Sequence, residues 1–127
     1  MTAYLLVFLG AGIGGALRHG VNTGCARWCG VDFPWGTLAV NVLGSLAMGL
    51  IAGWLAFRAT ESWSQHARLF LTTGILGGFT TFSAYSLDTV LLWERGQTLL
   101  ALTYAAGSAI ASIAALALGL AIVRALS

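Results

Sequence analysis

Residues 72–86 read TTGILGGFTTFSAYS and lie in the middle of a long apolar segment. Gly77 and Gly78 lower the helix propensity there, and the β-branched Thr80 and Thr81 follow directly. The apolar context continues on both sides, so the sequence predicts a helix that is broken within a membrane. Such a break leaves backbone groups without partners, and it survives only where protein or a polar path surrounds it. The alternative is an ordinary kinked helix, because glycine is common in membrane helices.

The composition indicates a membrane protein. Of the 127 residues, 58% are hydrophobic and 8% are charged, whereas soluble domains carry about 25% charged residues. Four apolar segments, residues 2–21, 35–57, 69–93 and 99–123, are long enough to cross a hydrocarbon core of about 30 Å. The predicted fold class is therefore an all-α membrane protein with four transmembrane helices in one domain, residues 1–127.

The arginines are balanced across the predicted membrane, and there is no lysine. The side with both termini carries Arg58, Arg68 and Arg124, and the opposite side carries Arg18, Arg27 and Arg95. This balance nearly removes the positive-inside signal, so we expect insertion in both orientations and assembly as an antiparallel homodimer with two-fold symmetry. The scattered arginines form no basic patch, so no nucleic-acid partner is expected.

Two rows of neutral polar residues follow single helix faces at a spacing of four. The rows are Thr37, Asn41 and Ser45 in the second segment and Tyr104, Ser108 and Ser112 in the fourth. All of these side chains donate hydrogen bonds without charge, which suits a partly dehydrated anion. Inward-facing carboxylates, which a cation or proton pathway would need, are missing from both rows. The alternative is that the hydroxyls bond to carbonyls of their own helices or join neighbouring helices.

Four further side chains are candidates for an ion pathway. Phe82 and Tyr85 share a helix face, and the positive edges of their rings can meet a small anion; the alternative is ordinary packing. Arg18 either extends to the membrane surface or supplies positive potential at a pore mouth. Asp88 has an open role, and pairing with Arg18 is one possibility.

No constellation for catalysis or metal binding is present. His19 and His66 are isolated in the sequence, and no serine or cysteine comes with a recognisable base. Cys25 and Cys29 lack the further ligands that a zinc site needs. We therefore predict a protein that is not an enzyme.

Three motifs resemble those of the CrcB/Fluc fluoride channels. GGFTTFSAYS at residues 77–86 resembles the family signature GG-x-TTFSTFS. WGTLAVNVLGS at residues 35–45 resembles the second-helix motif G-T-x-x-x-N-x-x-G, and GIGGALR at residues 12–18 resembles the glycine–arginine run of the first helix. Length and helix layout match as well, so the resemblance covers the whole chain.

This resemblance implies a dual-topology, antiparallel homodimer in the bacterial inner membrane, with four helices in each multi-pass subunit. It implies passive export of fluoride, which lowers cytoplasmic fluoride, through pores that run along the dimer interface. A sodium ion at the dimer centre would be held by backbone carbonyls of Gly77 and Thr80, and Arg18 would lie at a pore vestibule. The pore residues that it implies are Phe82, Tyr85, Asn41, Tyr104, Ser108 and Ser112.

The chain departs from the family pattern at three positions. Residue 85 is Tyr where the family usually has Phe, residue 84 is Ala where it often has Thr, and residue 88 is Asp where it commonly has Glu. The tyrosine retains the ring edge and adds a hydroxyl, which either donates to fluoride or obstructs its path.

Two other classes of protein compete with a fluoride channel. A small dual-topology, proton-coupled multidrug exporter has the same size and helix count, but it needs a carboxylate in its first helix, and residues 2–21 contain none. A non-transporting assembly protein, built on glycine pairs such as Gly10 and Gly14, would leave both polar rows unexplained.

Overall fold

The computed structural model describes residues 1–127, and its regular elements are all helical. Four helices are long and apolar enough to cross a membrane, as the sequence predicted. The third of them is composite, and it contains four helical elements and a short non-helical stretch. In chain order the elements are α1 (Thr2–Cys29), α2 (Trp35–Ala56), α3 (Ser64–Arg68), the π-helical η1 (Leu69–Leu76), α4 (Gly77–Phe79), α5 (Ser83–Glu94) and α6 (Thr98–Leu126).

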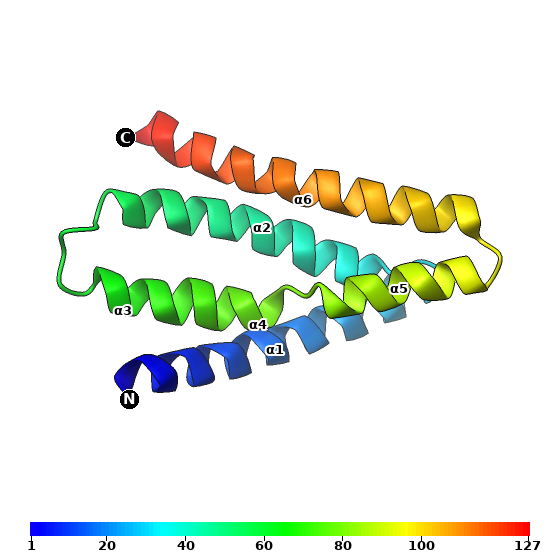
Figure 1. The fold of residues 1–127 in the computed structure, drawn as a ribbon, viewed down its shortest axis with the longest axis horizontal. Helices are drawn as coiled ribbons and strands as arrows, with labels where there is room; N and C mark the ends of the chain where they lie inside the picture. The colour runs from blue at the N-terminus through cyan, green and yellow to red at the C-terminus, as the bar shows by residue number, and fades with distance from the viewer.

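The long helices run alongside one another with their ends grouped at two sides of the molecule (Figure 1). Both termini and the α2–α3 connection lie at one end, and the α1–α2 and α5–α6 connections lie at the other (Figure 1). The most extensive packing joins α2 to α6 and α1 to η1 and α4, whereas α2 touches η1 and α3 much less. Contacts of α1 with α2 and of α5 with α6 join these pairs, so the composite third helix packs on α1 in its first part and on α6 in its last part.

Glycines allow the backbones of each tight pair to approach closely. A Cβ atom on Gly14 of α1 would lie 2.8 Å from the backbone nitrogen of Phe79 and would also clash with the Ile75 carbonyl. In the other pair, a Cβ atom on Gly119 of α6 would lie 2.6 Å from the carbonyl oxygen of Leu46. Such close approach stabilises helix pairs in lipid through van der Waals contact.

Helix α1 continues to Cys29, beyond the end that we predicted at residue 21. Nothing between Asn22 and Cys29 breaks a helix, and the chain leaves it only at Gly30, where φ is 85°. With 28 residues the helix is about 42 Å long, more than the hydrocarbon core of about 30 Å requires. The predicted span was too short because membrane thickness sets only the minimum length of a spanning helix. It does not determine the residue at which the helix ends.

The composite third helix departs from helical geometry after its glycine pair, not at it. Gly77 and Gly78 are helical within α4, Thr80 is extended with φ −83° and ψ 158°, and α5 begins at Ser83. Gly78 is required for packing, since a Cβ atom there would lie 2.9 Å from the Cα of Ala11 in α1. The sequence also did not predict the π-helical winding of η1.

Candidate functional site

A cavity of about 290 Å³ lies where residues 80–82 pass between α2, α5 and α6. Five of the six pore residues that the resemblance implied line it, and the sixth, Tyr104, does not. No carboxylate is among the lining residues, which are Asn41, Ser45, Thr80, Thr81, Phe82, Tyr85, Ser108, Ala109, Ser112 and Ile113. The tertiary structure thus brings two residues of each polar row together with the aromatic pair.

Three serine hydroxyls in this cavity donate no hydrogen bond to their own helices. By contrast, six other Ser or Thr hydroxyls of the chain, including that of Thr80 in the same cavity, donate to the carbonyl four residues earlier, for example Thr72 to Arg68 at 2.6 Å. Ser45, Ser108 and Ser112 make no such bond, and the Ser112 Oγ is shielded from solvent without any partner. Bonding to the helix backbone therefore does not account for these three serines.

Asn41 holds the non-helical backbone in place. Its Nδ2 donates to the Thr81 carbonyl oxygen at 3.0 Å, and its Oδ1 accepts from the Thr81 N–H at 2.8 Å. The Thr81 hydroxyl in turn accepts from the N–H of Ala84 at 3.1 Å, in the first turn of α5. These bonds satisfy polar groups that the interruption would otherwise leave without partners. The sequence placed Thr81 in the predicted break and in the TTFS motif, but it assigned this residue no role at the site.

Three aromatic rings stack from the cavity into the bundle. Ring centroids are 5.5 Å apart both between Phe82 and Tyr85 and between Tyr85 and Tyr104. The Tyr85 hydroxyl donates to the Ala105 carbonyl oxygen at 2.6 Å, so its proton is already used within the chain. Phe82 is 77% exposed, whereas Tyr104 is buried beneath Tyr85.

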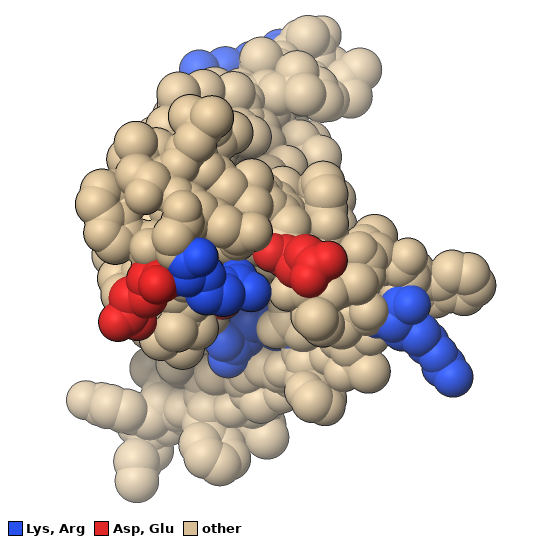
Figure 2. Space-filling model, turned by 90° about the vertical axis from the view of Figure 1, so that its right-hand side faces the viewer, with Lys and Arg blue, Asp and Glu red and all other residues tan.

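A second cavity, of about 520 Å³, lies at the end of the molecule that carries the α1–α2 and α5–α6 connections. Acidic and basic side chains lie close to one another on this end of the surface (Figure 2). Asp88 and Arg95 line the cavity together with Thr37, which precedes Asn41 by one turn of α2. The polar row of α2 thus leads from this cavity to the first one.

Asp88 does not pair with Arg18, so that suggestion from the sequence was wrong. Its Oδ2 instead accepts a hydrogen bond from the Tyr104 hydroxyl at 3.4 Å. Arg18 lines neither cavity; it is half-buried, and its Nε is shielded from solvent without a partner. The structure therefore does not bring Arg18 into contact with the cavity residues.

The carbonyl oxygens of Gly77 and Thr80 accept no hydrogen bond. Outside the helices, the backbone bonds of this segment are Thr80 N–H to the Leu76 carbonyl and Ser86 N–H to the Phe82 carbonyl, both 2.9 Å. The Thr80 hydroxyl also donates to Leu76, at 2.8 Å. Two backbone oxygens are thus free beside the interruption.

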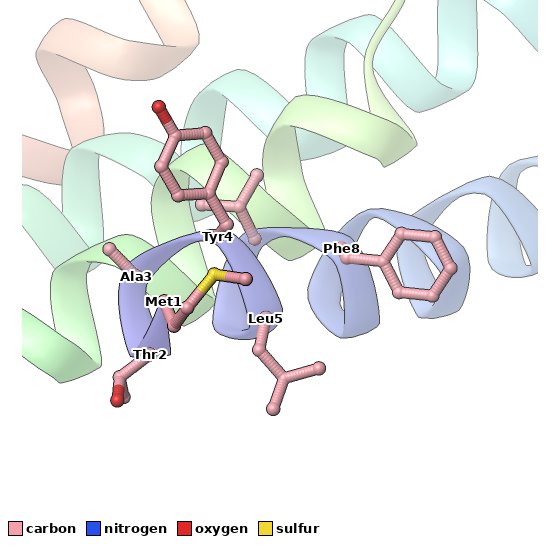
Figure 3. Close-up of a pocket in the computed structure, with 7 residues that line it drawn as sticks. Met1, Thr2, Ala3, Tyr4, Leu5 and Phe8 are labelled. Atoms are coloured by element: carbon pink, nitrogen blue, oxygen red, sulfur yellow. The ribbon is translucent and has the colours of Figure 1, made fainter.

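A third hollow, at the N-terminus, is lined only by residues of the first turns of α1 (Figure 3). The side chains of Tyr4, Leu5 and Phe8 point in different directions there, and all three are exposed (Figure 3). No second element closes this hollow, and six of its seven lining residues are hydrophobic.

Four apolar membrane-crossing helices define a multi-pass membrane protein, and a cavity lined in part by neutral donors lies beside its third helix. The family described as "CrcB-like protein, Camphor Resistance (CrcB)" matches residues 5–120, and the chain belongs to this family. A protein of Nitrobacter hamburgensis named "Fluoride-specific ion channel FluC 2" is 57% identical over 121 residues, 95% of this chain and 96% of that protein. The "Fluoride-specific ion channel FluC" of Rhodopseudomonas palustris is 56% identical over 124 residues, 98% of each chain. These bacterial relatives are named as ion channels, not as exporters or enzymes.

Proposed function

We propose that this protein is a fluoride-selective channel that exports fluoride passively and lowers its cytoplasmic concentration. The main observation behind this proposal is that three serines, Ser45, Ser108 and Ser112, line one cavity. Their hydroxyls donate no hydrogen bond to carbonyls of their own helices. The names of the relatives support the same substrate. An exporter coupled to protons is not favoured, because α1 contains no carboxylate.

Neutral donors suit fluoride because this ion is small and strongly hydrated. A pore must replace its water with several hydrogen bonds that are favourable for entry but weak enough for exit. The three hydroxyls supply such donors, and the ring edges of Phe82 and Tyr85 add positive potential without a full charge. The Asn41 amide uses one of its two N–H groups on Thr81, so the second remains for the anion.

Arg18 would act through its field, not by contact. Its guanidinium has no carboxylate partner, and part of it is shielded from solvent. A charge in a low-dielectric setting raises the local concentration of anions over several ångströms. We assign it to the vestibule on this basis, as the resemblance implied.

The channel is proposed to be an antiparallel, dual-topology homodimer in which the interruption at residues 80–82 lies within the membrane. Phe82 is 77% exposed beside the cavity that Asn41 and the three serines line. Polar groups facing lipid are costly, so a second copy of the chain is needed to cover this side. Single cysteines at both ends, labelled from one side of sealed vesicles, should each react in about half of the molecules if both orientations occur.

A sodium ion at the dimer centre fits the free carbonyl oxygens of Gly77 and Thr80. Hard cations prefer oxygen ligands, and these two carbonyls accept no hydrogen bond within the chain. A bound cation would supply the positive partner that these oxygens lack. We expect replacement of sodium by N-methylglucamine to lower the thermal stability of the dimer, and an unchanged stability would contradict the site.

The decisive experiment is ion efflux from liposomes that contain the purified protein. We expect rapid fluoride release with the membrane potential clamped, and chloride release that matches protein-free liposomes. Equal release of both ions, or no fluoride release, would contradict the proposal.

A further inference from the structure

A cavity of about 380 Å³ lies between the end of α2 and the composite third helix, at the end of the molecule that carries the termini. Apolar residues of α2 line one side of it, and polar residues of the following segment line the other. The apolar side (the wall) comprises Met48, Ala52, Leu55 and Ala56, and the polar side (the mouth) comprises Glu61, Ser64, Gln65, Arg68 and Thr72. None of these residues belongs to the proposed fluoride path.

Opposite charges line the mouth without pairing. Glu61 and Arg68 both face the cavity, yet no ion pair joins them, and one Arg68 N–H group donates to the Gln65 Oε1 at 3.0 Å instead. Guanidinium carries five donors, so most remain available, and the Glu61 carboxylate has no side-chain partner. The mouth is therefore complementary to a ligand that carries a negative and a positive group.

Tryptophans near the same connection indicate where the cavity lies relative to the membrane. Trp54 and Trp63 stack with centroids 5.5 Å apart, and the Arg58 guanidinium lies 5.9 Å from the Trp54 ring. Tryptophan and arginine together are typical of the head-group level of a bilayer. Ala56 is the wall residue nearest this level in the sequence. From Ala56 the wall follows α2 back to Met48, toward the hydrocarbon core.

We propose that this cavity binds a phospholipid whose head group carries a phosphate and a primary ammonium, as in phosphatidylethanolamine. Arg68 binds the phosphate, Glu61 accepts hydrogen bonds from the ammonium, and the α2 wall contacts the start of an acyl chain. Arginine matches phosphate oxygens with parallel N–H groups, and a primary ammonium offers three donors where choline offers none. The site does not depend on the ion that the channel conducts.

Native mass spectrometry of the full-length protein tests this proposal with equimolar palmitoyl-oleoyl lipids that have ethanolamine, choline or glycerol head groups. We expect the ethanolamine lipid to be retained about tenfold more than the choline lipid, the difference that one charge-assisted hydrogen bond makes. Equal retention of these two lipids, or preferential retention of the glycerol lipid, would overturn the assignment. Glycerophosphoethanolamine should displace the lipid poorly, and full displacement would identify a soluble ligand.

Two kinds of variant separate this site from non-specific lipid contact. Arg68→Gln and Glu61→Gln should each remove the preference for ethanolamine, whereas Arg58→Gln, the same change outside the cavity, should not. Ala52→Leu keeps every charge and fills the exposed apolar wall, so it should reduce retention of the ethanolamine lipid as well. Unchanged retention in Arg68→Gln and Ala52→Leu would mean that a second copy of the chain fills the cavity, and the proposal would fail.

Discussion

The side-chain amide of Asn41 forms two hydrogen bonds with the backbone of Thr81, at 3.0 Å to its carbonyl and 2.8 Å from its N–H. The amide donates one hydrogen bond to this backbone and accepts one from it, as the backbone of a paired β-strand would. These bonds stabilise the extended backbone between α4 and α5. This pairing connects the proposed ion path to the fold, because the residue that offers a donor to the anion also positions the interruption.

Asn41→Asp should abolish most fluoride flux. The carboxylate can still accept from the Thr81 N–H, but it cannot donate to the Thr81 carbonyl, and it adds a negative charge to the cavity. Leaving a buried acceptor unpaired costs about 1–3 kcal/mol, so we expect more than a tenfold decrease in liposome efflux. Gln65→Glu makes the same chemical change outside this cavity and should leave flux unchanged. Undiminished flux in Asn41→Asp would exclude Asn41 from the path.

Phe82→Ile should slow fluoride flux by about tenfold or more while the dimer persists, because a branched aliphatic chain has no positive ring edge. Efflux measures the flux, and size-exclusion chromatography measures assembly. Phe8→Ile is the matched control, since Phe8 is 75% exposed and lines no part of this cavity. Normal efflux in Phe82→Ile would refute a pore role for the ring.

Tyr85→Phe should leave fluoride flux unchanged or raise it. The Tyr85 hydroxyl donates to the Ala105 carbonyl, so its removal takes no donor away from the anion. Loss of this bond should lower stability by about 0.5–1.5 kcal/mol, which a thermal melt in detergent can detect. A severe loss of flux would show that the hydroxyl leaves Ala105 and binds the ion directly.

Ser112→Ala should reduce flux without reducing stability. The Ser112 Oγ is shielded and makes no hydrogen bond, so its removal breaks no bond within the chain. Thr72→Val is the converse control, because the Thr72 hydroxyl donates to Arg68 at 2.6 Å and lies outside the cavity. We expect Thr72→Val to lower the melting temperature and to leave efflux within about twofold, since a neutral hydrogen bond contributes about 1 kcal/mol. The reverse pattern would mean that Ser112 is only a packing residue.

Gly14→Ala should destabilise the pairing of α1 with the third helix. The added Cβ would lie 2.8 Å from the Phe79 nitrogen, and such overpacking costs about 1–3 kcal/mol. At Gly15 a Cβ atom meets nothing within 4 Å, so Gly15→Ala should raise stability by about 0.5–1 kcal/mol through helix propensity. Equal melting temperatures for the two variants would contradict this account.

The membrane spans were predictable because hydropathy and length act locally, without knowledge of the rest of the chain. Their ends were not, as α1 illustrates by continuing to Cys29. The sequence also predicted a break within residues 72–86, and within this stretch the structure has extended backbone at Thr80. Of the two glycines that suggested the break, Gly78 contacts α1, whereas a Cβ atom on Gly77 would meet only the Thr72 carbonyl oxygen, at 3.6 Å.

The candidate site, like the membrane spans, could be predicted from the sequence only in part. The sequence by itself determined four apolar spans, two rows of neutral donors at helical spacing and a first helix without carboxylates, since each follows from residue type and periodicity. Only the tertiary structure decided that two residues of each row line one cavity, that Asn41 pairs with Thr81, and that the Tyr85 hydroxyl donates to the Ala105 carbonyl. These outcomes depend on which helices pack closely, and close packing is set by contacts between residues far apart in the chain.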